Sequence, residues 1–391
     1  MQSKPGSASS MIPATTHWKK ASVFLFLTLL FACGGKENEP SPADNAKDRE
    51  IILAHWVDNI IIPSYEKFQS SFEAMQEKED AFIASPDQTS LSALREAWVN
   101  AYTEWQKVEL LEFGPADKYT LRNFFNIYPA DVNGILTNMN DPSVNLDLPA
   151  AYPTQGFPAL DYLLNGTGSD DATILAAYTT DPDAAKRIAY LDRVTTRMTA
   201  LLTNVVSEWN GPYRETFLGR TGLDIGSSTG VAVNAFVLYY ERHVRSGKIG
   251  IPSGAAFGTT GIAYPEKVEA FYKKDISLQL AKTAHQAAMD FFNGKNVNTG
   301  SEGPSFKSYL DALGVKDAST GTMLSDLINS QFANISGELD QLSPSLFEQV
   351  QTDNQKMVTT YNAMQALVRM LKVDMTSAMS VTITYTDNDG D

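Results

Sequence analysis

The sequence predicts an all-helical protein, and three observations support this fold class. Apolar residues recur at intervals of three and four over segments of helix length in most of the chain. Capping residues and Gly–Pro pairs stand at the ends of several of these segments. No two neighbouring segments alternate as paired β-strands require. A glycine-rich stretch at residues 211–230 separates two groups of helices, and we expect helical domains at residues 45–215 and 216–391.

The composition excludes several classes of function. The 391 residues carry a formal net charge of −15 and contain no Lys/Arg-rich cluster, which excludes a nucleic-acid partner. The single cysteine, Cys33, rules out an intramolecular disulfide and any Cys-based zinc or redox site. The four histidines do not form an H-x-x-x-H or H-E-x-x-H arrangement, so no standard zinc-protease site is encoded. An apolar content of 43% is sufficient for a packed core.

Residues 1–32 are predicted to be a signal peptide rather than part of the fold. Two lysines precede an apolar run at residues 21–31, which is too short to span a bilayer. The run ends in Leu-Phe-Ala-Cys33, which resembles the lipobox of bacterial lipoproteins. That resemblance implies a lipid anchor at Cys33, a polar tether at residues 33–44 and an outer-membrane lipoprotein that faces the periplasm or the outside. The alternative for Cys33 is a buried free thiol.

The first helices are predicted between residues 45 and 113. An apolar stripe begins at Ile51, and Pro63 should kink or restart the helix there. Asp87 or Ser90 can cap the next helix, which runs to Gly114-Pro115. Near its end Glu109 and Glu112 are three residues apart, so they can hold a cation or form a solvated acidic face.

The middle of the chain predicts a long loop followed by a short helix. Residues 117–155 show turn signals and little periodicity, as in a functional loop. Gly156 to Gly166 then predicts a helix with Pro158 in its first turn, where a missing N–H costs nothing. Asp161 lies three residues after Pro158, on the same helix face. It can bind a hard cation through oxygen or stabilise the N-terminus of its own helix.

The second half of the chain predicts further helices, and it ends in a strand-like segment at residues 381–385 and an acidic terminus. The expected helices are 181–209, 229–246, 265–293, 305–313, 320–340 and 344–374. The helix at 229–246 leads into a charged turn, and this region holds four candidate site residues: Glu241, Arg242, Arg245 and Lys248. Glu241 and Arg245 either form a surface ion pair, or all four residues face the 156–166 helix and bind an anionic or metal-bound ligand.

The 156–166 stretch resembles the signature of the imelysin family, Gly-x-His-x-x-Glu followed by an aromatic residue and Leu-Leu. Gly156 matches, Pro158 stands in place of the His, Asp161 stands in place of the Glu, and residues 162–164 match the continuation. Weaker resemblances lie in the helix that ends at Gly114-Pro115, in the turn after Lys248 and in the C-terminal tail. The resemblance implies two bundle domains with a site between them, to which Gly156, Pro158 and Asp161 would contribute.

Three functions remain open at this point. The first is a catalytically inactive, lipid-anchored envelope protein that binds a ligand or an envelope partner in the uptake of iron or another divalent metal. The second is a metallopeptidase, a class in which the family has been placed, but Pro158 offers no atom to bind the metal. The third is a scaffold with a dead site that binds another envelope protein. No cofactor is identified, and Asp161 is the candidate ligand for iron or another divalent metal.

Overall fold

The computed structural model describes residues 46–258 and 262–385, and its regular structure is helical. These residues contain no β-strand, only an isolated bridge between Lys316 and Met323. The prediction of an all-α fold is therefore confirmed. The signal peptide, the tether with Cys33 and the acidic terminus lie outside the described residues. None of the helices within them is long and apolar enough to cross a membrane.

The first part of the chain folds into long helices joined by short ones. Its elements are α1 Ala46–Trp56, η1 Val57–Ile61, α2 Ile62–Ala84, α3 Gln88–Val108, η2 Glu109–Leu111, α4 Pro115–Lys118, α5 Leu121–Phe125, α6 Val132–Asn140, η3 Pro149–Thr154, α7 Gly156–Asp161, η4 Tyr162–Gly166, α8 Asp171–Thr179, α9 Ala184–Trp209 and α10 Pro212–Leu218.

The second part continues with helices of mixed length, several of them partly π-helical. Its elements are α11 Ser228–Leu238, η5 Tyr239–Gly250, α12 Ile251–Ser253, η6 Ala255–Phe257, η7 Pro265–Lys267, α13 Ser277–Phe292, α14 Phe306–Ala312, α15 Leu324–Leu339, α16 Leu346–Thr352, α17 Asn354–Arg369, η8 Met370–Met375 and α18 Thr376–Ala378.

Local sequence signals account for the ends of the long helices. Asp87 caps α3, because its side chain accepts a hydrogen bond from the Ser90 amide while the Ser90 hydroxyl accepts one from Asp87 N. Pro63 lies in the first turn of α2, where its missing N–H is harmless, and the π-helical turn η1 precedes it. The predicted cap is confirmed. At Pro63 the chain stays helical, and the only irregularity is the π-helical turn before it.

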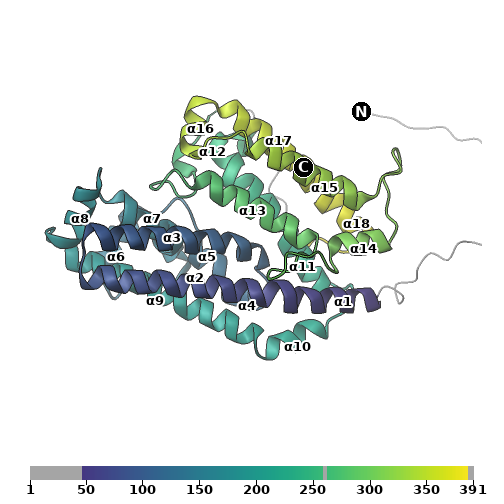
Figure 1. Cartoon of the computed structure of the whole chain (residues 1–391), viewed down its shortest axis with the longest axis horizontal. Helices are drawn as coiled ribbons and strands as arrows, with labels where there is room; N and C mark the ends of the chain where they lie inside the picture. Colours follow the sequence, from purple (N-terminus) through teal and green to yellow (C-terminus); the bar gives the residue numbers. More distant parts are fainter. Residues whose placement is uncertain (1–45, 259–261, 386–391) are drawn as a thin grey trace, which may run out of the picture. The chain divides into compact units, whose positions relative to one another are not determined.

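The long helices pack side by side (Figure 1), and the buried apolar residues of the described chain form one contiguous core. Helix α2 contacts α3 and α9, α3 contacts α13, and α13 leads through α15 to α17. The centre of the first layer is aromatic: the Trp105 and Phe125 rings stack with centroids 5.0 Å apart, and Phe68 and Phe157 pack around them. Burial of such large rings is the main driving force for this packing. The division into domains at residue 216 stays a prediction.

Two segments that lack helical periodicity contain more helix than the sequence predicts. The region 117–155 was expected to be a long loop, but it contains α5, α6 and η3. The glycine-rich stretch 211–230 was expected to be a linker, but it contains α10. These helices have at most nine residues and show too few turns of periodicity to be recognised, so tertiary packing rather than sequence pattern determines them.

The predicted helix at residues 265–293 is wrong in its first third. A short 3-10 turn, η7, is followed by an irregular segment, and α13 begins only at Ser277. Ala270 and Lys274 have positive φ values of 55° and 61°, which a helix does not allow. The tail at 381–385 is not a strand either, and the Asn234 side chain bonds the backbone at Thr382 and Thr384.

Candidate ligand-binding site

The glycine of the signature is required by its backbone environment. Gly156 has a φ of +77°, and a Cβ atom at this position would lie 2.4 Å from the carbonyl oxygen of Phe125. Both facts exclude larger residues. Helix α7 begins at this glycine with Pro158 in its first turn, as predicted, and ends at Asp161, where the π-helical turn η4 takes over.

Asp161 fixes a distant segment to the signature. Its carboxylate is 1% exposed and accepts hydrogen bonds from the backbone amides of Tyr272 (2.8 Å) and Lys273 (2.9 Å) and from Asn165 Nδ2 (3.1 Å). Burial raises the pKa of Asp161 to about 7, although these hydrogen bonds act in the opposite direction. The expectation that Asp161 stabilises its own helix N-terminus is therefore wrong, because Asp161 is the last residue of α7 and both backbone amides that it binds belong to another part of the chain.

A cavity of about 160 Å³ lies beside the signature. Pro158 and Asp161 line it from α7, and the remaining walls come from two irregular segments, 128–130 and 266–272. Its surface is mostly aromatic and aliphatic, with Asp161 and Glu266 as its only acidic groups among the described residues. We call this cavity the signature pocket. Its size and mixed surface suit a small organic group rather than a large ligand.

A buried ion pair lies next to the signature pocket. Lys248 Nζ lies 2.5 Å from Glu269 Oε2 and 2.7 Å from Gln106 Oε1, and neither charged side chain is more than 2% exposed. The other oxygen, Glu269 Oε1, accepts hydrogen bonds from Tyr102, Gln106 and Asn126 at 2.9–3.0 Å. Residues 268 and 270, which flank Glu269, line the signature pocket. The pair therefore stabilises the wall of that pocket.

A second carboxylate, Glu109, adjoins the same pair. It lies 4.0 Å from Lys248 Nζ and 3.8 Å from Arg122 Nε, and it is 2% exposed. Burial raises its pKa even though both cations act to lower it. Within the described residues, Glu109 Oε2 and Arg122 Nε have no hydrogen-bond partner. The solvated acidic face expected for Glu109 and Glu112 is thus wrong, and burial raises the pKa of Glu112 to about 7.

Tyr128 connects the signature pocket to the buried carboxylates. It lines the pocket, and its pKa is raised well above the ordinary value by burial and by the negative charges of Glu269 and Glu109. The phenol therefore stays protonated and can donate a hydrogen bond. A ligand in the signature pocket would lie in contact with Tyr128.

Of the four predicted residues in the region of η5, Lys248 joins the site and the other three form a second cluster. Glu241 accepts hydrogen bonds from Lys372 Nζ (3.0 Å) and Tyr385 Oη (2.8 Å), and Arg245 lies 3.9 Å from it. Arg242 lies over the Tyr385 ring, 5.4 Å from its centroid. Glu241 and Arg245 are both 2% exposed, so the expected surface ion pair is buried instead.

The residues around the signature do not fit a directly bound metal ion. Pro158 has no ligand atom, and the oxygens of Asp161 already accept three hydrogen bonds. Across residues 46–258 and 262–385, no three His, Cys, Asp or Glu side chains are grouped as a metal site requires. His285 is buried against Tyr240 and Phe332, and it does not line the signature pocket.

Sequence reasoning missed five residues of this site: Tyr102, Gln106, Asn126, Tyr128 and Glu269. One signal was available, since Glu269 interrupts the otherwise apolar run Val-Glu-Ala-Phe at residues 268–271. The others lie on two separate segments, α3 and residues 126–128, and only the folded chain brings them together with Glu269. Gly156 and Pro158 were predicted at the site by resemblance; Pro158 lines the signature pocket, whereas Gly156 begins the same helix and does not line the pocket.

The fold and the site define an all-helical protein whose pocket lies beside a helix that begins at a glycine. A buried ion pair lies next to this pocket. The chain belongs to the imelysin family: the family model described as Imelysin matches residues 61–373. No curated protein sequence is significantly similar to the chain.

Two solved structures are similar in fold. One, from Parabacteroides distasonis, is described as an iron-regulated protein A precursor; it is 20% identical, with a TM-score of 0.67, over 88% of this chain and 97% of that one. The other is an imelysin-like protein from Psychrobacter arcticum, 16% identical, with a TM-score of 0.66, over 87% of this chain and 98% of that one. At these identities the similarity establishes the shared fold.

Proposed function

We propose that the protein is a catalytically inactive binding component of the cell envelope, acting in the acquisition of iron or another metal, and that its ligand occupies the signature pocket. The observation that supports this most strongly is that Pro158 and Asp161, the two altered signature residues, line one cavity. The lipobox-like sequence before Cys33 supports an anchored position in the envelope. The similar fold described as an iron-regulated protein A precursor supports the link to iron.

The chemistry of the signature pocket favours binding over hydrolysis. A metallopeptidase needs a bound metal, a polarised water and a general base. Pro158 supplies no metal ligand, and Asp161 uses its oxygens to hold the amides of Tyr272 and Lys273. The pocket therefore fits an organic or protein-borne group, and the metal would arrive as part of a complex or with a partner protein.

A growth experiment tests this function. A strain that lacks the gene would be complemented with the wild-type gene, with Ala130→Trp, which fills the signature pocket, and with Ala172→Trp on the exposed surface of α8 as the control. Under iron limitation we expect the wild type and the control to restore growth and Ala130→Trp to fail. Equal growth of the deletion strain and the wild type would refute the role in iron acquisition. Full rescue by Ala130→Trp would refute the position of the site.

A biochemical experiment tests the absence of peptidase activity and of a bare-metal site. Protein purified from the envelope would be incubated with unfolded casein, with and without a chelator, and titrated with iron, zinc and calcium by calorimetry. We expect no cleavage and no saturable binding. Chelator-sensitive cleavage would overturn the inactive assignment. Saturable metal binding that is lost in Asp161→Ala would show that the altered signature still binds a metal directly.

A further inference from the structure

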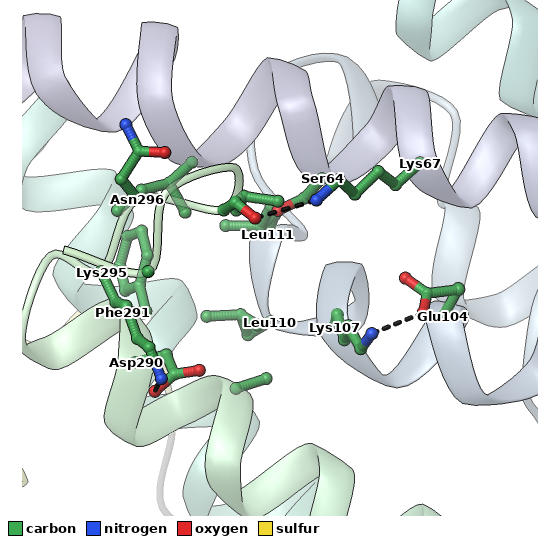
Figure 2. Close-up of a pocket in the computed structure, with 14 residues that line it drawn as sticks. Ser64, Lys67, Glu104, Lys107, Leu110, Leu111, Asp290, Phe291, Lys295 and Asn296 are labelled. Atoms are coloured by element: carbon green, nitrogen blue, oxygen red, sulfur yellow. Dashed lines mark hydrogen bonds and ion pairs between the residues drawn. The ribbon is translucent and has the colours of Figure 1, made fainter.

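A second cavity, distinct from the signature pocket, lies between α2, α3, α13 and the loop that follows α13 (Figure 2). Its volume is about 220 Å³, and it shares no lining residue with the signature pocket. Its floor is apolar and consists of Ile60, Leu110, Leu111 and Phe291, which are at most 6% exposed. We call this cavity the lysine-rimmed pocket, because Lys67, Lys107 and Lys295 line its edge.

The wall formed by the loop is fixed to the start of the first long helix. Val297 N donates to the carbonyl of Asn59 (3.0 Å), and the Asn296 amide donates to the Asn59 side chain (2.7 Å). Gly294, where the loop begins, has a φ of +67°, and a Cβ there would lie 2.7 Å from the carbonyl oxygen of Gly303. The loop is thus held in one conformation by several contacts. A preformed cavity of this kind binds a ligand without a large cost for ordering its wall.

The charges around the rim leave one ammonium group without an acidic partner. Lys107 pairs with Glu104 at 2.5 Å, and Lys295 pairs with Asp290 at 3.3 Å, so these two pairs are neutral. Lys67 Nζ donates to the neutral carbonyl of Val297 at 2.8 Å, and it forms no ion pair within the described part of the chain. The rim therefore carries one net positive charge, in a protein whose overall formal charge is −15.

Figure 2 shows how the charged and apolar groups are arranged. Leu110 points into the middle of the cavity, with Lys107 on one side and the Lys295–Asp290 pair on the other. The side chain of Lys67 runs along α2 and turns its ammonium group toward the loop. A ligand that lies over Leu110 thus has an apolar surface beneath it and an ammonium group at one end.

We propose that the lysine-rimmed pocket is a binding site for a small organic monoanion, a carboxylate with a compact apolar body. The carboxylate binds the ammonium group of Lys67, and the body covers Leu110, Leu111 and Phe291. A charge-assisted hydrogen bond to an ammonium is stronger than the neutral bond to Val297 O that Lys67 makes otherwise. The apolar body gains free energy in proportion to the area it removes from water. This inference does not depend on the function proposed for the signature pocket.

The test is a titration of the full-length protein in detergent with 2-naphthoate, followed by ligand fluorescence and calorimetry. We expect saturable binding at one site, with affinity for the uncharged 2-naphthamide at least about tenfold lower, because the amide cannot pair with an ammonium. Raising the salt concentration should weaken naphthoate binding and leave amide binding unchanged. Inorganic phosphate, which has charge and no apolar body, should not compete.

Matched variants locate the site. Lys67→Gln removes the charge and keeps an N–H donor for Val297, and it should weaken naphthoate binding at least about fivefold. Lys78→Gln makes the same change at an exposed position of the same helix and should have no effect. Ala287→Phe fills the cavity from α13 and should abolish binding, and its circular dichroism shows whether it folds.

Four results would overturn the proposal: no saturable binding of naphthoate, equal affinity for the amide, equal effects of the two lysine substitutions, or displacement of bound naphthoate by phosphate. If Ala287→Phe does not fold, the comparison of Lys67→Gln with Lys78→Gln decides by itself. Growth under iron limitation is a separate readout. A failure of naphthoate binding therefore leaves the function proposed for the signature pocket unaffected.

Discussion

Glu269 and Glu79 are both almost completely buried, at 2% and 3% exposure, but the structure accommodates them differently. Glu269 lies between α3 and η5 with the Lys248 ammonium at 2.5 Å. Glu79 lies between α2 and α9, and its hydrogen-bond partner is the Thr195 hydroxyl at 2.8 Å. Burial raises the pKa of Glu79 to about 8, so it binds a proton at neutral pH. One contact therefore depends on a cation, and the other depends on pH.

Removal of the cation should have the largest effect. Lys248→Met leaves Glu269, and Glu109 next to it, buried without their ammonium partner, which should lower the free energy of unfolding by about 3–5 kcal/mol. Urea denaturation measures this loss. Lys282→Met, which breaks the exposed pair with Asp340, is the control and should cost less than about 1 kcal/mol.

Removing both charges sharpens the same test. Lys248→Met combined with Glu269→Gln leaves no unpaired charge at residue 269, and Glu109 keeps Arg122 at 3.8 Å. The double substitution should therefore recover part of the stability that the single substitution loses. A loss below about 1 kcal/mol for Lys248→Met alone would contradict the view that the ion pair is essential to this contact.

A smaller loss is expected at the second cluster of η5. Glu241→Gln keeps an oxygen for Tyr385 and removes the charge that faces Lys372. The Lys372 side chain is 17% exposed, compared with 1% for Lys248, so water can compensate in part. Arg245, the buried cation 3.9 Å from Glu241, keeps its hydrogen bond to the Tyr361 hydroxyl. We expect a loss of about 1–2 kcal/mol by the same denaturation experiment. A loss as large as that of Lys248→Met would show that the exposure of the cation does not decide the cost.

Glu79, the buried carboxyl group without a cationic partner, should make the stability of the protein depend on pH. Because the pKa of Glu79 is raised to about 8 in the folded state, the folded protein keeps a proton that the unfolded chain loses above about pH 4.5. The Glu79 contribution to stability should fall as the pH rises through this window, by at most about 1.4 kcal/mol per pH unit, and level off above pH 8. Asp161 and Glu112, with pKa values raised to about 7, contribute with the same sign.

Glu79→Gln should remove the Glu79 share of this slope, because an amide has no proton to lose. Melting temperatures from pH 5 to 9 would measure it, with Glu77→Gln on the exposed face of the same helix as the control. The interpretation is wrong if the variant and the wild type lose stability in parallel across this range.

The smallest effect is expected for Asp161→Asn, which should change only the segment that Asp161 binds. Asp161→Asn gives the signature one acceptor oxygen instead of two, so it cannot hold the amides of both Tyr272 and Lys273. Hydrogen exchange of these two amides should accelerate several-fold, while exchange in α3 stays unchanged. Unchanged protection at both amides would show that the segment keeps its conformation without the carboxylate.

Patterns within single helices predicted most of the fold, because the spacing of apolar residues in an amphipathic helix shows which face is buried. The cap at Asp87 and the short helix at Pro158 are such local features. The site was harder to predict from the sequence, because its contacts join distant residues. Asp161, for example, binds amides 111 and 112 residues further along the chain. The same contact explains why residues 268–276 are not helical although their apolar spacing suggests a helix. The spacing of apolar residues along the sequence contains no information about tertiary contacts. For the same reason Glu109 was predicted at the surface, although it is buried.

Gly156 shows that a family signature contains two kinds of requirement. The glycine is needed because any side chain would collide with the carbonyl oxygen of Phe125, whatever the pocket binds. Pro158 and Asp161, in contrast, contribute to the site itself: both line the signature pocket, and Asp161 also binds the amides of Tyr272 and Lys273. The glycine therefore reports on the fold, whereas residues 158 and 161 report on the chemistry of the site. An activity known from relatives should be judged on these two positions.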